Sequence, residues 1–124
     1  MSEHRDLQMQ KVHDFREAFF KVISTHPGML YRDAYKVAAE SEAPRFYCTY
    51  EQARKFVSLI KRKRPLPLRQ ENKRRMYRDI YKKWKAAGHT TFKALHEIIN
   101  SPAPSFYLSE TTVMAFGHMY RKRK

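Results

Sequence analysis

Apolar residues recur along this chain at intervals of three and four, which is the spacing of amphipathic helices. The pattern predicts helices over residues 8–24, 29–40 and 50–63, and again over 68–86, 91–100 and 110–122. The third helix of each half has a matching apolar stripe: Ala53, Phe56, Val57 and Ile60 in the first, Val113, Phe116, Gly117 and Tyr120 in the second. With only three glycines among 124 residues, we expect an all-α fold.

The segments "APRFYCT" (43–49) and "APSFYLS" (103–109) interrupt this helical pattern. Pro44 and Pro104 lack an N–H group and push the preceding residue out of the helical region, so the chain must break there. Thr49 and Ser109 are good N-caps, and Thr49 with Gln52 forms a capping-box pattern. We therefore expect each segment to end one helix, pack its Phe-Tyr pair onto the core and start the next helix.

The chain also repeats itself. A shift of 60 aligns residues 28–64 with 88–124 and gives eight identities: Gly28/Gly88, Ala34/Ala94, Ser41/Ser101, Ala43/Ala103, Pro44/Pro104, Phe46/Phe106, Tyr47/Tyr107 and Phe56/Phe116. A shift of 61 matches the apolar stripes of the first helices. The sequence thus predicts two tandem three-helix units, residues 1–64 and 65–124, joined by a short basic linker that contains Pro65 and Pro67.

Positive charge is concentrated in the second half. The net charge is +14; residues 1–60 hold nine Lys and Arg against eight Asp and Glu, whereas residues 61–124 hold seventeen against four. Such an excess implies an acidic partner, and nucleic acid is the commonest one. No apolar stretch is long enough to span a membrane and the N-terminus is unlike a secretory signal, so we expect a cytoplasmic, nucleoid-associated protein or one carried in a virion.

The order helix, helix, connection, helix with a basic end resembles helix-turn-helix DNA-binding modules. The connection of about eight residues is longer than the usual three or four. The text "PAPSFYLS" (102–109) is also similar to a segment of small, basic, mostly uncharacterised proteins of gut anaerobes and their mobile elements. The first resemblance implies that each third helix enters a groove of duplex DNA; the second implies no activity.

Candidate contacts follow from these positions. On the outward faces of the third helices lie Gln52, Arg54, Lys55 and Ser58 in the first copy and Thr111, Thr112 and His118 in the second. Such side chains can read base edges, although a solvated helix face is the alternative. The basic runs are better suited to phosphates: Lys61, Arg62, Lys63 and Arg64; Lys73, Arg74 and Arg75; Arg121 and Lys122.

Signals of catalysis are weak. The second half shows no paired carboxylates, the histidines share no zinc spacing, and no Gly-rich phosphate loop occurs, so we expect no catalytic residue, metal, cofactor or small-molecule substrate. Tyr77, Tyr81 and Trp84 could stack on bases, but core packing is the favoured interpretation. Cys48 aligns with Leu108, which indicates a buried, inert thiol.

The sequence thus predicts a non-enzymatic protein that binds double-stranded DNA and serves as a regulator, for instance of transcription, or as an accessory factor of a bacterial, phage or mobile-element system. Two alternatives remain open. One is a structural or interaction protein, such as a phage virion or assembly component. The other is an RNA-binding protein, because a basic aromatic helix can also hold structured RNA. The oligomeric state is left open.

Overall fold

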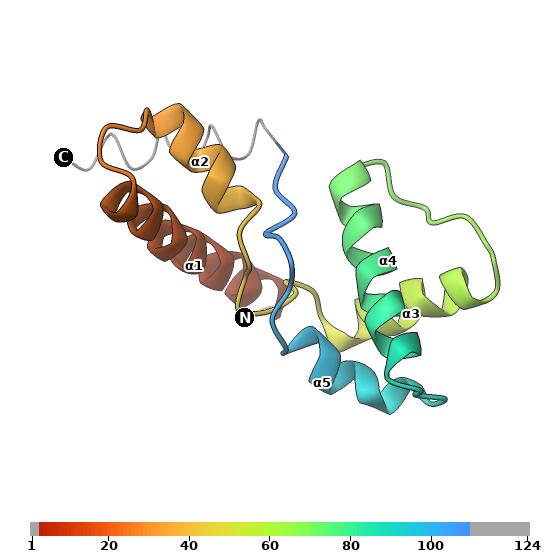
Figure 1. The fold of residues 1–124 in the computed structure, drawn as a ribbon. Helices are drawn as coiled ribbons and strands as arrows, with labels where there is room; N and C mark the ends of the chain where they lie inside the picture. The colour runs from red at the N-terminus through yellow and green to blue at the C-terminus, as the bar shows by residue number, and fades with distance from the viewer. Residues whose placement is uncertain (1–2, 110–124) are drawn as a thin grey trace.

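A computed structural model describes residues 3–109 of the chain (Figure 1). Its elements in order are α1 (Glu3–Thr25), α2 (Tyr31–Ala39), α3 (Tyr50–Lys61), α4 (Glu71–Ala86), the short 3-10 helix η1 (Phe92–Ala94) and α5 (Leu95–Ile99). Within that range there is no β-strand beyond a single bridge between Ala43 and Ala103. The expected all-α class is confirmed, while the helix predicted over residues 110–122 lies outside the described residues.

Local sequence signals explain most of the helix boundaries. Thr49 caps α3 through a complete capping box, with its hydroxyl accepting from the Gln52 N–H (3.1 Å) and its own N–H donating to Gln52 Oε1 (3.0 Å). Gly28 and Gly88 follow α1 and α4 with φ of 91° and 75°, a conformation that glycine adopts without strain. Helix α4 begins at Glu71, three residues later than the predicted start at residue 68.

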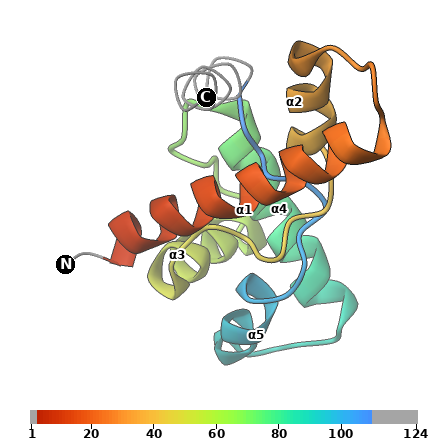
Figure 2. The same ribbon diagram turned by 90° about the vertical axis from the view of Figure 1, so that its left-hand side faces the viewer.

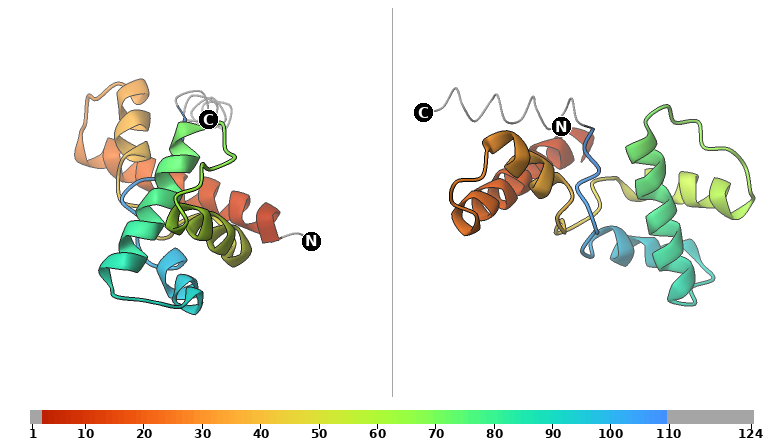
Figure 3. Two further views of the ribbon diagram at one scale, coloured as in Figure 1. Left: turned by 90° about the vertical axis from the view of Figure 1, so that its right-hand side faces the viewer. Right: turned by 45° about the horizontal axis from the view of Figure 1, so that its top comes forward.

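The helices form two lobes. The first lobe consists of α1 packed against α2, and the second lobe consists of α3, α4 and α5 packed against one another (Figure 1). Two extended stretches run between them, which we call the first crossing segment (residues 40–49) and the second crossing segment (residues 100–109). The N-terminal half of α1 reaches out of its own lobe and lies beside α3, as Figure 2 and the left panel of Figure 3 show.

The crossing segments pair with each other in antiparallel fashion. The Ala43 N–H donates to Ala103 O (2.8 Å), and the Ala103 N–H donates to Ala43 O (2.9 Å). Each segment also bonds to the lobe it enters: the Phe46 N–H donates to Ile99 O, and the Phe106 N–H donates to Ala39 O, both at 3.0 Å. Within each pair of bonds, the donor and acceptor of one bond are shifted by 60 positions, in opposite directions, from those of its partner, so the sequence repeat is also a repeat in geometry.

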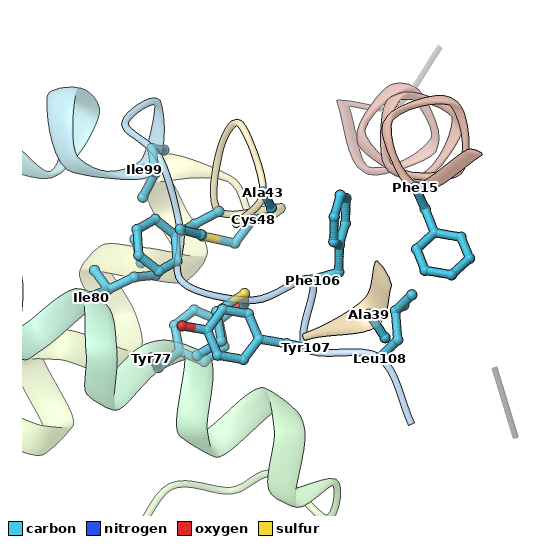
Figure 4. Close-up of a cluster of buried hydrophobic side chains, with 14 of the residues drawn as sticks. Phe15, Ala39, Ala43, Cys48, Tyr77, Ile80, Ile99, Phe106, Tyr107 and Leu108 are labelled. Atoms are coloured by element: carbon cyan, nitrogen blue, oxygen red, sulfur yellow. The ribbon is translucent and has the colours of Figure 1, made fainter. Parts of the chain in front are cut away.

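Aromatic side chains lock this crossing. Phe46 stacks on Tyr107 and Tyr47 stacks on Phe106, with centroid distances of 6.2 and 6.0 Å. Phe106 also meets Phe15 of α1 edge to face at 5.6 Å, and it lies near Ala39 in the close-up of Figure 4. The expectation that the Phe-Tyr pairs pack onto the core is confirmed, since Phe46 and Phe106 are each 1% exposed.

The crossing separates helices that the sequence grouped together. Helix α3 of the first copy leaves α1 and α2 and packs chiefly on α4 and α5 of the second copy. The two tandem three-helix units, 1–64 and 65–124, are therefore not confirmed in that form. The Pro-containing segment 62–70 connects α3 to α4 within one lobe, and its Leu66 and Leu68 pack against the core, so it is not a linker between lobes.

Candidate nucleic-acid interface

Helix α3 presents its outer face to solvent in the second lobe. Arg54 and Lys55 are exposed, and Ser58 is half-buried one turn later. Together with Arg62 and the ring of Phe92, these side chains line a shallow groove, into which Glu51 brings one negative charge. Four of the predicted contacts, Arg54, Lys55, Ser58 and Arg62, therefore share one accessible surface, which we call the α3 face.

The basic run at the end of α3 extends this surface. Lys61, Arg62, Lys63 and Arg64 are all exposed. The Lys61 Nζ lies over the rings of Trp84 and Phe92, 5.6 and 5.7 Å from their centroids, and these cation–π contacts leave the ammonium group open to solvent. Cations at this end are also favoured by the helix dipole.

The helix end itself is closed by a left-handed residue. Lys63 has φ of 57°, its N–H donates to Ile60 O, and the Arg64 N–H donates to Leu59 O, both at 2.9 Å. This is the Schellman arrangement, in which glycine usually occupies the position of Lys63. The chain therefore keeps a lysine here against the preference of the backbone.

Gln52 does not belong to the α3 face. Its backbone N–H and its side-chain oxygen are engaged with Thr49 in the capping box, and the side chain lines a different pocket on the inner side of α3. The structure thus separates Gln52 from Arg54 and Lys55, with which the sequence grouped it.

The three residues of the basic run 73–75 also differ in their surroundings. Arg74 donates to Glu71 Oε2 (2.7 Å) and to Leu68 O (2.6 Å), so it fastens the segment before α4 to the helix. Its charge and hydrogen bond lower the pKa of Glu71. Arg75 donates to Ser105 Oγ (3.1 Å), approaches Glu40 and lies over the Tyr107 ring, so it holds the second crossing segment. Of the three, Lys73 alone is exposed and in none of these bonds.

Five further predicted contacts, Thr111, Thr112, His118, Arg121 and Lys122, lie outside the described residues. The aromatic residues of α4 do lie within them. Tyr77 and Trp84 are buried, and the Trp84 Nε1 donates to Thr91 O (2.9 Å). Core packing, the favoured interpretation of these two side chains, is therefore confirmed. Tyr81 is half-buried against the same core.

The crossing-segment tyrosines are held by carboxylates. The Tyr47 hydroxyl donates to Asp14 Oδ2 and the Tyr107 hydroxyl donates to Asp79 Oδ2, both at 2.6 Å. Burial and then the bonded carboxylate raise the pKa of each phenol, so both remain neutral donors. Tyr107 has φ of 53°, a strained conformation that directs its ring to Phe46. These two tyrosines therefore stabilise the fold.

Chemistry at Cys48 is suppressed by its surroundings. The thiol is 1% exposed, and burial raises its pKa to about 12 against the opposing charges of Arg45 and Lys11. A buried protonated thiol is a poor nucleophile, as the sequence indicated. In the part of the chain that the structure describes, no group of three or more His, Cys, Asp or Glu side chains is arranged to hold a metal ion.

One site was missed at the sequence level. Lys11 of α1 and Lys73 of α4 line the same pocket on the inner side of α3. Lys11 stands four residues before Phe15, on the stripe of α1 that faces the core. This position is the feature of the sequence that could have indicated the site. A lysine on an apolar stripe is at least partly buried, and a search for charge runs does not detect it.

Comparison of the chain with protein-family models, with curated proteins and with solved structures gives no match. The helix-turn-helix resemblance and the "PAPSFYLS" resemblance therefore stay predictions. Among residues 3–109, no helix is long and apolar enough to cross a bilayer.

Proposed function

We propose that this chain is a non-enzymatic nucleic-acid-binding protein with duplex DNA as its main partner. The observation that carries the proposal is the α3 face: Arg54, Lys55 and Arg62 project from one side of a helix whose other side is buried in the second lobe. The run of four exposed cations, Lys61 to Arg64, continues this face. The net charge of +14 supports an acidic partner of this kind.

The α3 face and the basic run would contribute in different ways. Arginine can make bidentate contacts to guanine in the major groove, and serine can bond to several bases, so Arg54 and Ser58 suit base reading. Lys61 to Arg64 suit phosphates, which supply affinity with little sequence information. Arg74 and Arg75 are excluded from the proposed contacts because Glu71, Glu40 and Ser105 engage them.

A helix-turn-helix arrangement would then use helices from both copies. In the second lobe α4 and α5 of the second copy accompany α3 of the first, and α3 would be the recognition helix. A role as regulator or accessory factor in a bacterial or mobile-element system, in the nucleoid or in a virion, accords with such binding.

Affinity against salt concentration, measured for duplex DNA, single-stranded DNA and duplex RNA, tests the proposal. We expect the tightest binding to duplex DNA, with log K falling linearly against log salt at about 0.9 per phosphate contacted. No duplex DNA binding at about 0.15 M salt would overturn the proposal and favour a structural or interaction protein. Tighter binding to duplex RNA than to duplex DNA would indicate that RNA, and not DNA, is the partner.

A separate experiment tests whether the α3 face recognises the base sequence of DNA. Arg54→Ala with Lys55→Ala should reduce the preference among DNA sequences, because a lost base contact costs about 1–3 kcal/mol of discrimination. The matched control is Lys21→Ala with Arg32→Ala, which removes two exposed charges from the first lobe. Equal loss of preference in both double variants would contradict base reading by the α3 face.

A further inference from the structure

A polar pocket lies on the inner side of α3, away from the α3 face. The N-terminal half of α1, the helices α3 and α4 and both crossing segments meet around it. Its polar lining includes two lysines, three glutamines and a tyrosine: Lys11, Lys73, Gln8, Gln52, Gln70 and Tyr77. We call it the two-lysine pocket.

The two-lysine pocket is built from both copies of the repeat. Gln8 and Lys11 come from α1, and Gln70 and Lys73 lie 62 positions further along at the start of α4. Tyr47 and Tyr107, equivalent residues of the two crossing segments, also line it. Each copy therefore contributes one lysine and at least one glutamine and one tyrosine, and the pocket exists only because the two lobes are linked by the crossing.

Within residues 3–109, the positive charge in the pocket is not balanced. None of these residues brings a carboxylate into its lining, and none of them forms an ion pair with Lys11 or Lys73. Burial, and then the charge of Lys73, lower the pKa of Lys11 to about 8, which still leaves its ammonium group protonated at neutral pH. An unpaired, mostly buried charge is costly, and a bound anion removes that cost.

The other polar groups can donate to the same anion. Gln52 Oε1 accepts from the Thr49 N–H, so its amide nitrogen is left as a donor for the pocket. Burial raises the pKa of Tyr77, whose hydroxyl therefore keeps its proton. Ammonium, amide and phenol donors, with no carboxylate among the described lining residues, are a set that suits a phosphoryl group.

We propose that the two-lysine pocket binds a phosphoryl group, with Lys11 as the inner and Lys73 as the outer cation. The group could belong to a free phosphate ester or to the backbone of bound nucleic acid. The site is separate from the α3 face, and it stands whether or not that face binds DNA, since inorganic phosphate alone is a sufficient probe.

The test uses the full chain and inorganic phosphate, with chloride at equal ionic strength as reference. Phosphate in the millimolar range should raise the melting temperature of the wild-type protein, because a ligand that binds only the folded state stabilises it. Lys11→Met should melt higher than wild type without phosphate and should lose about tenfold or more in phosphate affinity by calorimetry. Lys21→Met, the same substitution at an exposed lysine of the first lobe, should keep the wild-type response.

Two results would overturn the proposal: no response of the wild-type protein to phosphate, or an unchanged response in Lys11→Met. If Lys11→Met fails to fold, Lys73→Gln at the exposed side of the pocket takes its place with the same expectation. Repeating the titration with saturating duplex DNA separates the two sources. Loss of the phosphate response with DNA bound supports a backbone phosphate as the occupant, and a retained response supports a free phosphate ester.

Discussion

Lys11 shows how one residue links stability to pH in this protein. Its ammonium group lies mostly buried, 5.7 Å from the Tyr47 ring centroid, in a pocket that it shares with Lys73. Burial lowers its pKa from 10.5 to about 8. The charged form therefore opposes folding below pH 8, and this penalty disappears as pH rises toward 10.5, because the unfolded chain then holds more protons than the folded one.

Comparing Lys11→Met with wild type isolates this effect. We expect the variant to be more stable at about pH 7, by on the order of 1–3 kcal/mol, and the difference to shrink as pH is raised to about 9.5. Cys48 acts in the opposite sense above pH 9.0, since its folded pKa is about 12; both proteins contain it, and only the smallest part of its pKa shift, the part due to Lys11, differs between them. Urea unfolding in phosphate-free buffer at the two pH values measures the difference. The same difference in unfolding free energy at both pH values would contradict a buried charge at Lys11.

At the scale of the element, the two Schellman ends provide a matched comparison. Helix α3 ends with Lys63 at φ 57°, and α4 ends with Gly88 at φ 75° in the same hydrogen-bonded arrangement. A side chain on a left-handed residue costs roughly 1 kcal/mol relative to glycine. The lysine at the end of α3 is therefore a place where charge is kept at the expense of stability.

Exchanging the two residue types tests this interpretation. Lys63→Gly should raise the free energy of unfolding by about 0.5–1 kcal/mol, and Gly88→Lys should lower it by a similar amount. A Cβ at Gly88 meets no atom within 4 Å, so any loss of stability in Gly88→Lys comes from the backbone conformation and not from a steric clash. Urea denaturation measures both. A stabilised Gly88→Lys, or a destabilised Lys63→Gly, would show that the backbone conformation is not what matters.

Element-scale features were largely predictable because their causes are local. The capping box of α3 joins Thr49 to Gln52, three residues away, and the break at Pro44 needs no distant partner. Where more distant contacts decide, the sequence was less informative. Arg74 and Arg75 read as phosphate contacts in a basic run, yet their partners Leu68, Glu40 and Ser105 are brought to them by the fold.

At the scale of the molecule, the exchange of α3 between the lobes could not be predicted. The apolar stripe of α3, Ala53 to Ile60, resembles that of residues 113–120, so either stripe can bury itself against either pair of first and second helices. The repeat therefore indicates which kinds of helix pack together and leaves the pairing undetermined. Candidate residues of the α3 face were predicted because exposure follows from helical periodicity, whereas the two-lysine pocket arises only from the crossing.

We expect the crossing to make the two lobes unfold together. Phe106 packs on Phe15 of the first lobe, while Trp84, the single tryptophan, is buried in the second. Phe106→Leu should lower stability by about 1 kcal/mol and shift the transition seen by Trp84 fluorescence as much as the one seen by far-UV circular dichroism. An unmoved Trp84 transition would mean that the lobes unfold independently.

We propose that the α3 face and its basic end contact DNA. The most direct measurement is the slope of log K against log salt for duplex DNA, with wild type compared to the variant in which Lys61, Arg62, Lys63 and Arg64 are all alanine. We predict that the slope becomes shallower by about 3.6, since each of the four phosphate contacts contributes about 0.9, with affinity reduced alike for all sequences. Lys21→Ala with Arg32→Ala should leave the slope nearly unchanged. An unaltered slope in the four-residue variant would contradict the claim.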